Sequence, residues 1–223
     1  MYGSQYVSYG TSKNCPRCAR VHLPREGIEE TSASRFKLLQ LMGELVYARK
    51  HQYAGVDQAD RMFGVLITPA AIYAAHSGQL HNGFTPFLIA ARGRGYTTCD
   101  ERGPNFPGLL DVRFRPITPD LYKGTKRGGG YPPGACAAPR LIQQAILDHQ
   151  RRNQRIDLTR WAMSEVMYKS DPTRSPASGQ DWVHGLTAHS CETCARLVPL
   201  LLCTHEADWT HDFDTTAFTR MFK

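Results

Sequence analysis

Two pairs of cysteines, each separated by two residues, constrain this chain more than any other feature. They are Cys15 with Cys18, and Cys191 with Cys194. The Cys-x-x-Cys spacing brings two sulfur atoms within about one turn of each other, which suits two thiolate ligands of a single zinc ion. The seven cysteines are an odd number and lack the dense, regular spacing of a small disulfide-stapled domain. The sequence therefore predicts reduced thiols that bind metal.

A third cysteine, Cys136, is expected at the start of a helix. Pro139 follows closely, and proline is tolerated in a first helical turn because its missing N–H group leaves no hydrogen bond unmade there. Apolar residues then recur at helical spacing to about Arg151. A helix N-terminus favours thiolate, since the positive end of the helix dipole lowers thiol pKa values. Cys136, Cys191 and Cys194 would give zinc three ligands and leave a fourth position for water.

The other sequence patterns predict one α/β domain, because helical and strand periods alternate along a chain of 223 residues. A first helix is expected from about residue 32, with Ser32 or Ser34 as its cap. The segments that follow are a β-hairpin formed by Met62–Thr68 and Ala71–Ala75, the Cys136 helix, a strand around Arg160–Met167, and a helix from Cys191 to about Pro199 or beyond.

This order of elements resembles the cytidine deaminase superfamily. The run Gly-Ala-Cys136-Ala-Ala138-Pro-Arg-Leu is similar to the first motif of bacterial polymorphic-toxin deaminases of the YwqJ-like group, and Ser190-Cys191-Glu-Thr-Cys194 is similar to the second. The resemblance covers roughly residues 61–205. It implies a three-layer α-β-α fold, with a mixed sheet, helices on both faces, and zinc between the N-termini of two helices.

The resemblance also divides the chain. Residues 1–30 form an N-terminal extension that carries the first thiol pair, and residues 31–223 form the deaminase domain. Within that domain, residues from about 80 to 130 are rich in Gly, Pro and Arg and are interpreted as an insertion. Neither the extension nor the insertion belongs to the part that resembles the family.

One position departs from the family pattern. The resemblance implies a catalytic glutamate two residues after the first zinc ligand, where it moves protons between the zinc-activated water and the base. This chain has Ala138 there, and alanine cannot move a proton, so the chain is expected to be nearly inactive. Ala138 is explained either by a natural pseudoenzyme or, as we favour from sequence, by a Glu-to-Ala substitution. Glu165 and Glu192 are considered as stand-ins for the missing glutamate, but neither has the required spacing, and both are more simply interpreted as surface or strand-end carboxylates.

The first thiol pair predicts a second, structural zinc site. Cys15, Cys18 and His22 would supply three ligands, and Cys99, Cys203 or His205 the fourth. The alternative is a pair of free or disulfide-linked thiols. Taken singly, Cys99 and Cys203 are more typical of small buried hydrophobic residues.

Substrate contacts are expected from three residues outside the metal ligands. The resemblance implies that His76 and Ser77, at the end of the hairpin, lie in the pocket, although both could equally be turn residues. Trp182 precedes the second thiol pair in a polar loop and could stack on an unpaired base, whereas Trp161, within an apolar strand, is expected in the core. A net charge of +7 favours a polyanionic partner.

These observations lead to a specific expectation. The chain is interpreted as a zinc-dependent hydrolase of amidines that converts cytosine to uracil in nucleic acid, in DNA more than RNA. As a toxin module it would act in the cytoplasm of a target cell after secretion, with an immunity protein as a further partner. Residues 1–14 lack a signal-peptide pattern, and no apolar run reaches membrane-spanning length. The alternatives are a non-catalytic zinc-stabilised nucleic-acid-binding module, or a deaminase of adenine or free nucleosides.

Overall fold

A six-stranded mixed sheet forms the centre of the molecule. The computed structural model describes residues 7–50, 61–78, 85–99, 108–122, 135–169, 185, 187 and 191–205. The strand order is β1-β2-β8-β3-β4-β5. The bounds of these strands are β1 Ser8–Tyr9, β2 Ile28–Glu29, β3 Arg61–Ile67, β4 Ile72–His76, β5 Thr97–Thr98 and β8 Ala162–Tyr168.

The three long strands match the sequence prediction. β3 and β4 form the expected antiparallel hairpin, whose register runs from Phe63 opposite His76 to Ile67 opposite Ile72. β8 pairs antiparallel with the other edge of β3 along its full length. Because β3 and β8 lie inside the sheet and are covered on both faces, most of their residues are buried, four of seven in β3 and six of seven in β8.

Residues from the N-terminal segment join the same sheet. β1 pairs antiparallel with β2, and β2 pairs parallel with β8 through Glu29 and Ala162. Each of these strands has two residues, too few to produce a period that a sequence could display. β5 adds a parallel pair at the far edge, beside β4.

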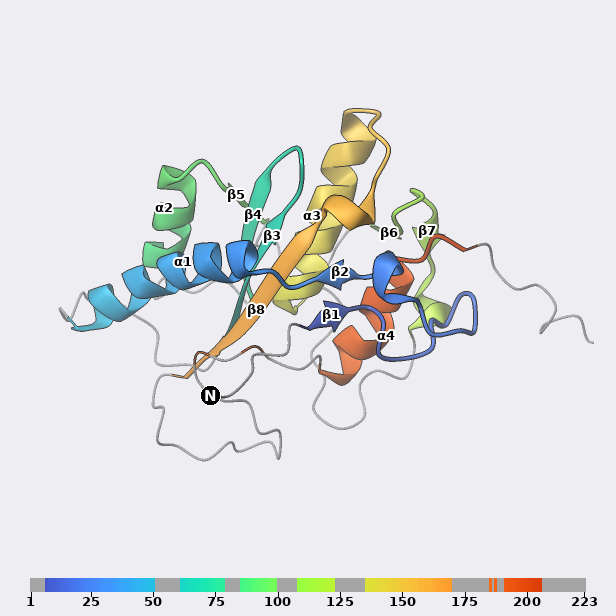
Figure 1. Cartoon of the computed structure of the whole chain (residues 1–223), viewed down its shortest axis with the longest axis horizontal. Coiled ribbons are helices and arrows are strands. Elements are labelled where there is room, and N and C mark those ends of the chain that lie inside the picture. Colours follow the sequence, from blue (N-terminus) through green and yellow to red (C-terminus); the bar gives the residue numbers. More distant parts are fainter. Residues whose placement is uncertain are drawn as a thin grey trace, which may run out of the picture.

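Helices cover both faces of the sheet. α1 (Ser32–Lys50) and α2 (Thr85–Gly93) pack on the face that carries Phe63 and Val65, whereas α3 (Ala137–Arg151) and α4 (Glu192–Leu201) share a core with Leu66 and Tyr73. In Figure 1, α1 and α2 lie to the left of the long strands and α3 and α4 to the right. The chain is therefore a mixed α/β protein with helices on both sides of its sheet.

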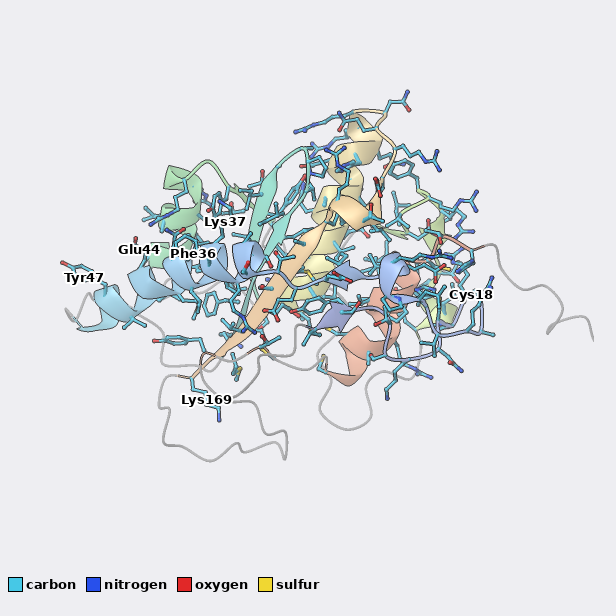
Figure 2. The ribbon with its side chains drawn as sticks, viewed as in Figure 1. Cys18, Phe36, Lys37, Glu44, Tyr47 and Lys169 are labelled. Carbon is cyan, nitrogen blue, oxygen red and sulfur yellow. The ribbon has the colours of Figure 1, made fainter. Side chains whose placement is uncertain are left out.

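The first helix begins as expected but is capped differently. Thr31, rather than Ser32 or Ser34, supplies the cap, since its Oγ1 accepts a hydrogen bond of 3.2 Å from the N–H group of Ser34. Some of its apolar residues face the core, while others are exposed, and Figure 2 shows Phe36 and Tyr47 projecting from α1. The buried set is Leu38, Leu41, Met42 and Leu45, and the exposed set is Phe36, Leu39, Val46 and Tyr47.

The region expected as an insertion contributes to the core where it is described. Phe87 and Ala91 of α2 are fully buried beneath α1. A second, two-stranded sheet pairs β6 (Leu109–Leu110) with β7 (Pro116–Ile117). Short 3-10 turns complete the described elements: η1 at Pro24–Glu26, η3 at Pro119–Leu121 and η4 at Leu158–Arg160. None of the described helices is both long and apolar enough to span a membrane.

Candidate metal centre

The position of Cys136 at a helix start is confirmed. Cys136 is the N-cap residue of α3, with extended backbone angles, and the helix runs on to Arg151. Pro139 lies at the third helical position, within the first turn, as the sequence predicted. The thiol of Cys136 therefore lies where the free N–H groups of a helix N-terminus point.

Helix α4 likewise begins at a cysteine. Cys191 is the N-cap residue of α4, and Cys194 lies in the first turn. Pro199 is inside the last turn and the helix ends at Leu201, as expected for a helix that ends at about Pro199 or beyond. α3 and α4 pack against each other, which brings their two N-termini together on one face of the sheet.

Three thiols meet where the two helices begin. The sulfur atoms of Cys136, Cys191 and Cys194 all lie within 4.8 Å of one another, and each side chain is buried. The Sγ atoms of Cys136 and Cys191 are 3.5 Å apart. The sequence therefore identified three residues that the fold does bring together, from two segments more than fifty residues apart in the chain.

The thiols strongly perturb one another's ionisation. Hydrogen bonding from Cys136, and then from Cys194, lowers the pKa of Cys191 to about 3. Hydrogen bonds with Cys136 and Cys191 raise the pKa of Cys194, and the hydrogen bond with Cys191 raises the pKa of Cys136. Cys191 is therefore the first of the three to become a thiolate, which is the form that binds metal.

Glu165 corrects the interpretation drawn from sequence. It is neither at the surface nor at a strand end: it lies in the middle of β8 with a side chain only 5% exposed. Its Oε1 accepts a hydrogen bond of 2.7 Å from the N–H group of Ala138, so the carboxylate caps the N-terminus of α3. Burial, followed by the nearby Cys191 thiol, raises the pKa of Glu165 to about 8, although the Ala138 N–H group opposes this rise.

The surroundings of Glu165 leave room for its side chain. Gly64 on β3 lies directly opposite it, and a Cβ at that glycine would come within 3.2 Å of the Glu165 Cγ and 2.8 Å of a Leu141 methyl group. The N–H group of Glu165 itself donates to the hydroxyl of Tyr9, 2.9 Å away. The position of Glu165 is thus fixed by Tyr9 of β1, which contacts its backbone, and by Ala138 of α3, which contacts its carboxylate, while Gly64 of β3 leaves space for the side chain. Glu192, the other carboxylate considered from sequence, begins α4.

The hairpin end lies next to Cys136. The guanidinium group of Arg140, in α3, donates to the carbonyl oxygens of His76 and Gly78 at 2.9 and 2.6 Å. The N–H group of Gly78 donates to the carbonyl of Ala135 at 2.7 Å. Ser77 closes the hairpin, since its hydroxyl accepts from the N–H group of Met62. His76 and Ser77 thus border the start of α3, and their contact with a substrate stays a prediction.

The two tryptophans considered as base-stacking residues have different outcomes. Trp161 is buried against the ring of His149 and belongs to the core, as expected. Trp182 lies outside the described residues, as does the basic run at 123–130. Two cavities of the described structure, of about 710 and 330 Å³, are lined by residues around η4 and contain none of the three thiols.

A second group of potential ligands forms around the N-terminal thiol pair. The donor atoms of Cys15, Cys18, His22 and Cys203 lie within 4.8 Å of one another, and all four side chains are buried. Cys203 is thus the fourth member. Cys99 is buried outside both groups, and His205 instead contacts Glu26, with Nε2 and Oε1 2.7 Å apart.

The donor set at the start of α3 and α4 fits zinc. Zinc favours thiolate ligands, and three protein ligands leave one tetrahedral position for water or substrate. We therefore expect the purified protein to carry one zinc ion at this site. The double variant Cys191→Ser, Cys194→Ser should lose one equivalent in elemental analysis. Undiminished zinc in that variant would refute the assignment.

Comparisons of the chain with protein-family models, with curated proteins and with solved structures found no match. The chemistry of the site is therefore argued from its own residues. Its distinguishing features are three thiols at two helix N-termini and one buried carboxylate beside them.

Proposed function

We propose that this chain is a zinc-dependent hydrolase that deaminates cytosine to uracil in nucleic acid. The observation that carries the proposal is the convergence of Cys136, Cys191 and Cys194 at two helix N-termini, with the buried carboxylate of Glu165 hydrogen-bonded beside them. The mixed sheet with α3 and α4 on one face is compatible with the cytidine-deaminase-like fold that the sequence motifs imply.

The three thiolates would hold zinc and leave one position free. When bound, zinc supplies a Lewis acid that lowers the pKa of water into the neutral range. Cys191, with its low pKa, provides the first thiolate, and the helix N-termini favour ionisation of Cys136 and Cys194 once a cation is present.

Glu165 takes the role that the family motif gives to a residue at position 138. Its Oε2 accepts no hydrogen bond from any described residue, so this oxygen remains able to bind a proton. In the proposed reaction Glu165 accepts a proton from the attacking water as the C4–O bond forms. It delivers this proton to ring nitrogen N3, then takes the remaining proton of the new C4 hydroxyl group and passes it to the amino group, so that C4=O forms, the C4–N4 bond breaks and ammonia leaves. Ala138 therefore need not make the chain inactive.

The substrate is proposed to be a polymer rather than a free nucleoside. The formal net charge of +7 favours a polyanion, since each Lys or Arg placed on a phosphate releases a counterion. We propose DNA rather than RNA as the substrate, which is the expectation drawn from the sequence. A deaminase of adenine or of free nucleosides remains the nearest enzymatic alternative.

The biological setting is proposed from the toxin-like motifs. A toxin module with this chemistry would be secreted by a bacterium, act in the cytoplasm of a target cell, and be neutralised in the producing cell by an immunity protein. The motif around Cys136 and the Ser-Cys-x-x-Cys run at 190–194 support this setting.

A second candidate function follows from Ala138. Its methyl group is buried at the start of α3, where the family motif has a carboxylate. A non-catalytic, zinc-stabilised module that binds nucleic acid would need no carboxylate there. The two functions differ in whether Glu165 is required for any reaction.

A deamination assay tests the proposal. DNA and RNA oligonucleotides, single- and double-stranded, are incubated with the zinc-loaded chain and then sequenced for cytosine-to-uracil changes. Conversion is expected with the unaltered chain and not with the Cys191→Ser, Cys194→Ser variant. A folded, zinc-loaded chain that converts no cytosine in any of these substrates, yet binds them, would favour the binding module.

Binding of nucleic acid should depend steeply on salt. If the basic residues contact phosphates, several counterions are released on binding, and the affinity for an oligonucleotide should fall by roughly 10³-fold between about 50 and 200 mM salt. Fluorescence anisotropy with a labelled oligonucleotide measures this slope. An affinity that salt leaves unchanged would argue against phosphate contacts, and binding of free nucleosides alone would favour the nucleoside alternative.

A further inference from the structure

The group formed by Cys15, Cys18, His22 and Cys203 lies away from the proposed reaction centre. Its four members come from the N-terminal segment and from the residue two positions beyond the end of α4. Figure 2 shows Cys18 on the side of the molecule opposite Tyr47. The proposed deamination makes no use of these residues, so their convergence needs a separate explanation.

The geometry of the group suits a tetrahedral ion. With Zn–S and Zn–N distances of about 2.3 and 2.0 Å, a sulfur and a nitrogen on one zinc ion lie about 3.5 Å apart. The Sγ of Cys18 and the Nε2 of His22 are 3.5 Å apart, and the other donor pairs fall within 4.8 Å. A thiol–imidazole hydrogen bond would satisfy that one pair, but it leaves two further buried thiols converging on the same point.

The local backbone is built to present the first two thiols. Cys15 and Cys18 lie in a tight reversal closed by a hydrogen bond from Ala19 N–H to the Cys15 carbonyl, and Asn14 pairs with Val21 across it. Ala19 has a φ of +56°, a left-handed conformation that costs a non-glycine residue about 1 kcal/mol. The surrounding structure maintains this conformation, which turns both thiols toward His22.

The position of Cys203 is fixed independently. The N–H group of Cys203 donates to the Leu200 carbonyl at the end of α4, and its own carbonyl accepts from Arg115 at 3.0 Å. The thiol of Cys15 in turn donates to the carbonyl of Pro199, in the last turn of α4. The N-terminal reversal and the C-terminal end of α4 are therefore in direct contact.

We infer that Cys15, Cys18, His22 and Cys203 bind one zinc ion in a closed, structural site that anchors the C-terminal end of α4. Four protein ligands complete a tetrahedral coordination sphere and leave no position for water, so the ion has no hydrolytic role. One cation binds all four buried ligand atoms at once, whereas the thiols of Cys15 and Cys203 otherwise make long hydrogen bonds, of 3.7 and 3.6 Å, to backbone carbonyls. All seven cysteines are free thiols, so no disulfide competes for these ligands.

A zinc ion at this structural site would also stabilise the site formed by Cys136, Cys191 and Cys194. α4 has ten residues, a length of about 15 Å, with Cys191 and Cys194 at one end and Cys203 just beyond the other. An ion that fixes the C-terminal end of so short a helix also limits how far its N-terminal thiols can move. Loss of the structural ion should therefore weaken zinc binding at the Cys136 site.

Metal analysis of the full chain tests the inference. The unaltered protein should carry two zinc ions, and Cys203→Ser should carry one, with a thermal unfolding midpoint lower by roughly 10 °C. Cys99→Ser is the matched control, because it replaces a buried thiol that belongs to neither group, and it should keep both ions. An unaltered chain with a single zinc that Cys191→Ser, Cys194→Ser removes, or a Cys203→Ser protein with two, overturns the inference.

Three further measurements keep the test decisive. If Cys203→Ser is insoluble, Cys203→His decides, because a second imidazole can replace the thiol as a ligand. This variant should be soluble with two zinc ions, and one zinc ion overturns the site. Amide hydrogen exchange in α4 should be faster in Cys203→Ser than in Cys99→Ser, and zinc affinity at the Cys136 site should fall roughly tenfold. Equal exchange and equal affinity would overturn the anchoring role.

Discussion

Replacing Glu165 with Gln is expected to slow cytosine deamination by about 10²- to 10⁴-fold without unfolding the protein. Glutamine has nearly the same shape, and its side-chain oxygen can still accept the hydrogen bond from Ala138 N–H that the carboxylate accepts at 2.7 Å. What it cannot do is move a proton between water, base and ammonia. The rate is measured by sequencing oligonucleotides after timed incubation.

Three controls separate a catalytic role from a structural one. Zinc content and oligonucleotide affinity should be the same for Glu165→Gln and the unaltered chain, because neither depends on proton transfer. Glu44→Gln, which changes an exposed carboxylate on α1, should leave the rate unchanged. If Glu165→Gln retains the full rate with its zinc in place, Glu165 is only the cap of α3.

Position 138 provides the complementary comparison. If Glu165 carries the proton, the unaltered chain is active, and Ala138→Glu adds a second carboxylate on the residue whose N–H group already binds the first. If instead Ala138 replaces the sole proton carrier, the unaltered chain is inactive and Ala138→Glu creates conversion. Both explanations place zinc on the same thiols, so the metal-free Cys191→Ser, Cys194→Ser protein is the baseline for each.

Replacing Arg140 with Met is expected to cost about 3–5 kcal/mol of unfolding free energy, which would lower the thermal midpoint by roughly 10 °C. The buried guanidinium group donates charge-assisted hydrogen bonds to the carbonyls of His76 and Gly78. Methionine fills similar space but can donate a hydrogen bond to neither carbonyl. Because Arg140 connects the hairpin end to the helix that Cys136 begins, zinc affinity should also fall.

Arg94→Met is the matched control for this change. Arg94 pairs with Glu44 at 2.9 Å, but both side chains are more than a third exposed, and such pairs contribute less than about 1 kcal/mol. Thermal unfolding of both variants, loaded with zinc, measures the difference. Equal midpoints would show that the contacts of Arg140 with the hairpin end contribute no more than an exposed ion pair.

The metal ligands could be predicted because their signal is local. Proline three residues after Cys136, and a Cys-x-x-Cys pair before an apolar run, each indicate a helix that begins at a cysteine, and both helices begin there. Hairpin strands β3 and β4 were equally visible, since apolar runs flank a short turn. These features depend on neighbouring residues alone.

Glu165 was misread because β8 is buried on both faces. Its adjacent polar residues, Ser164 and Glu165, suggest from sequence a strand with an exposed face, yet Ser164 bonds Ser34 of α1 while Glu165 caps α3 on the other side. Two consecutive polar residues within an otherwise apolar strand were the available signal. Cys203 could be named only as one of three candidates, because nothing local relates it to His22.

The location of three thiols on one short stretch also sets the order in which the protein can mature. Both thiol groups are completed by residues 191–203, so neither is whole until that stretch has been synthesised. At about 5–20 residues per second, Cys15, Cys18 and His22 wait on the order of ten seconds or more for Cys203. The pairing of β2 with β8 waits similarly, which raises the contact order of the fold. The pairing of β2 with β8 and the binding of both metal ions therefore take place late in synthesis. A ribosome stalled before residue 191 holds a chain in which neither thiol group can be completed.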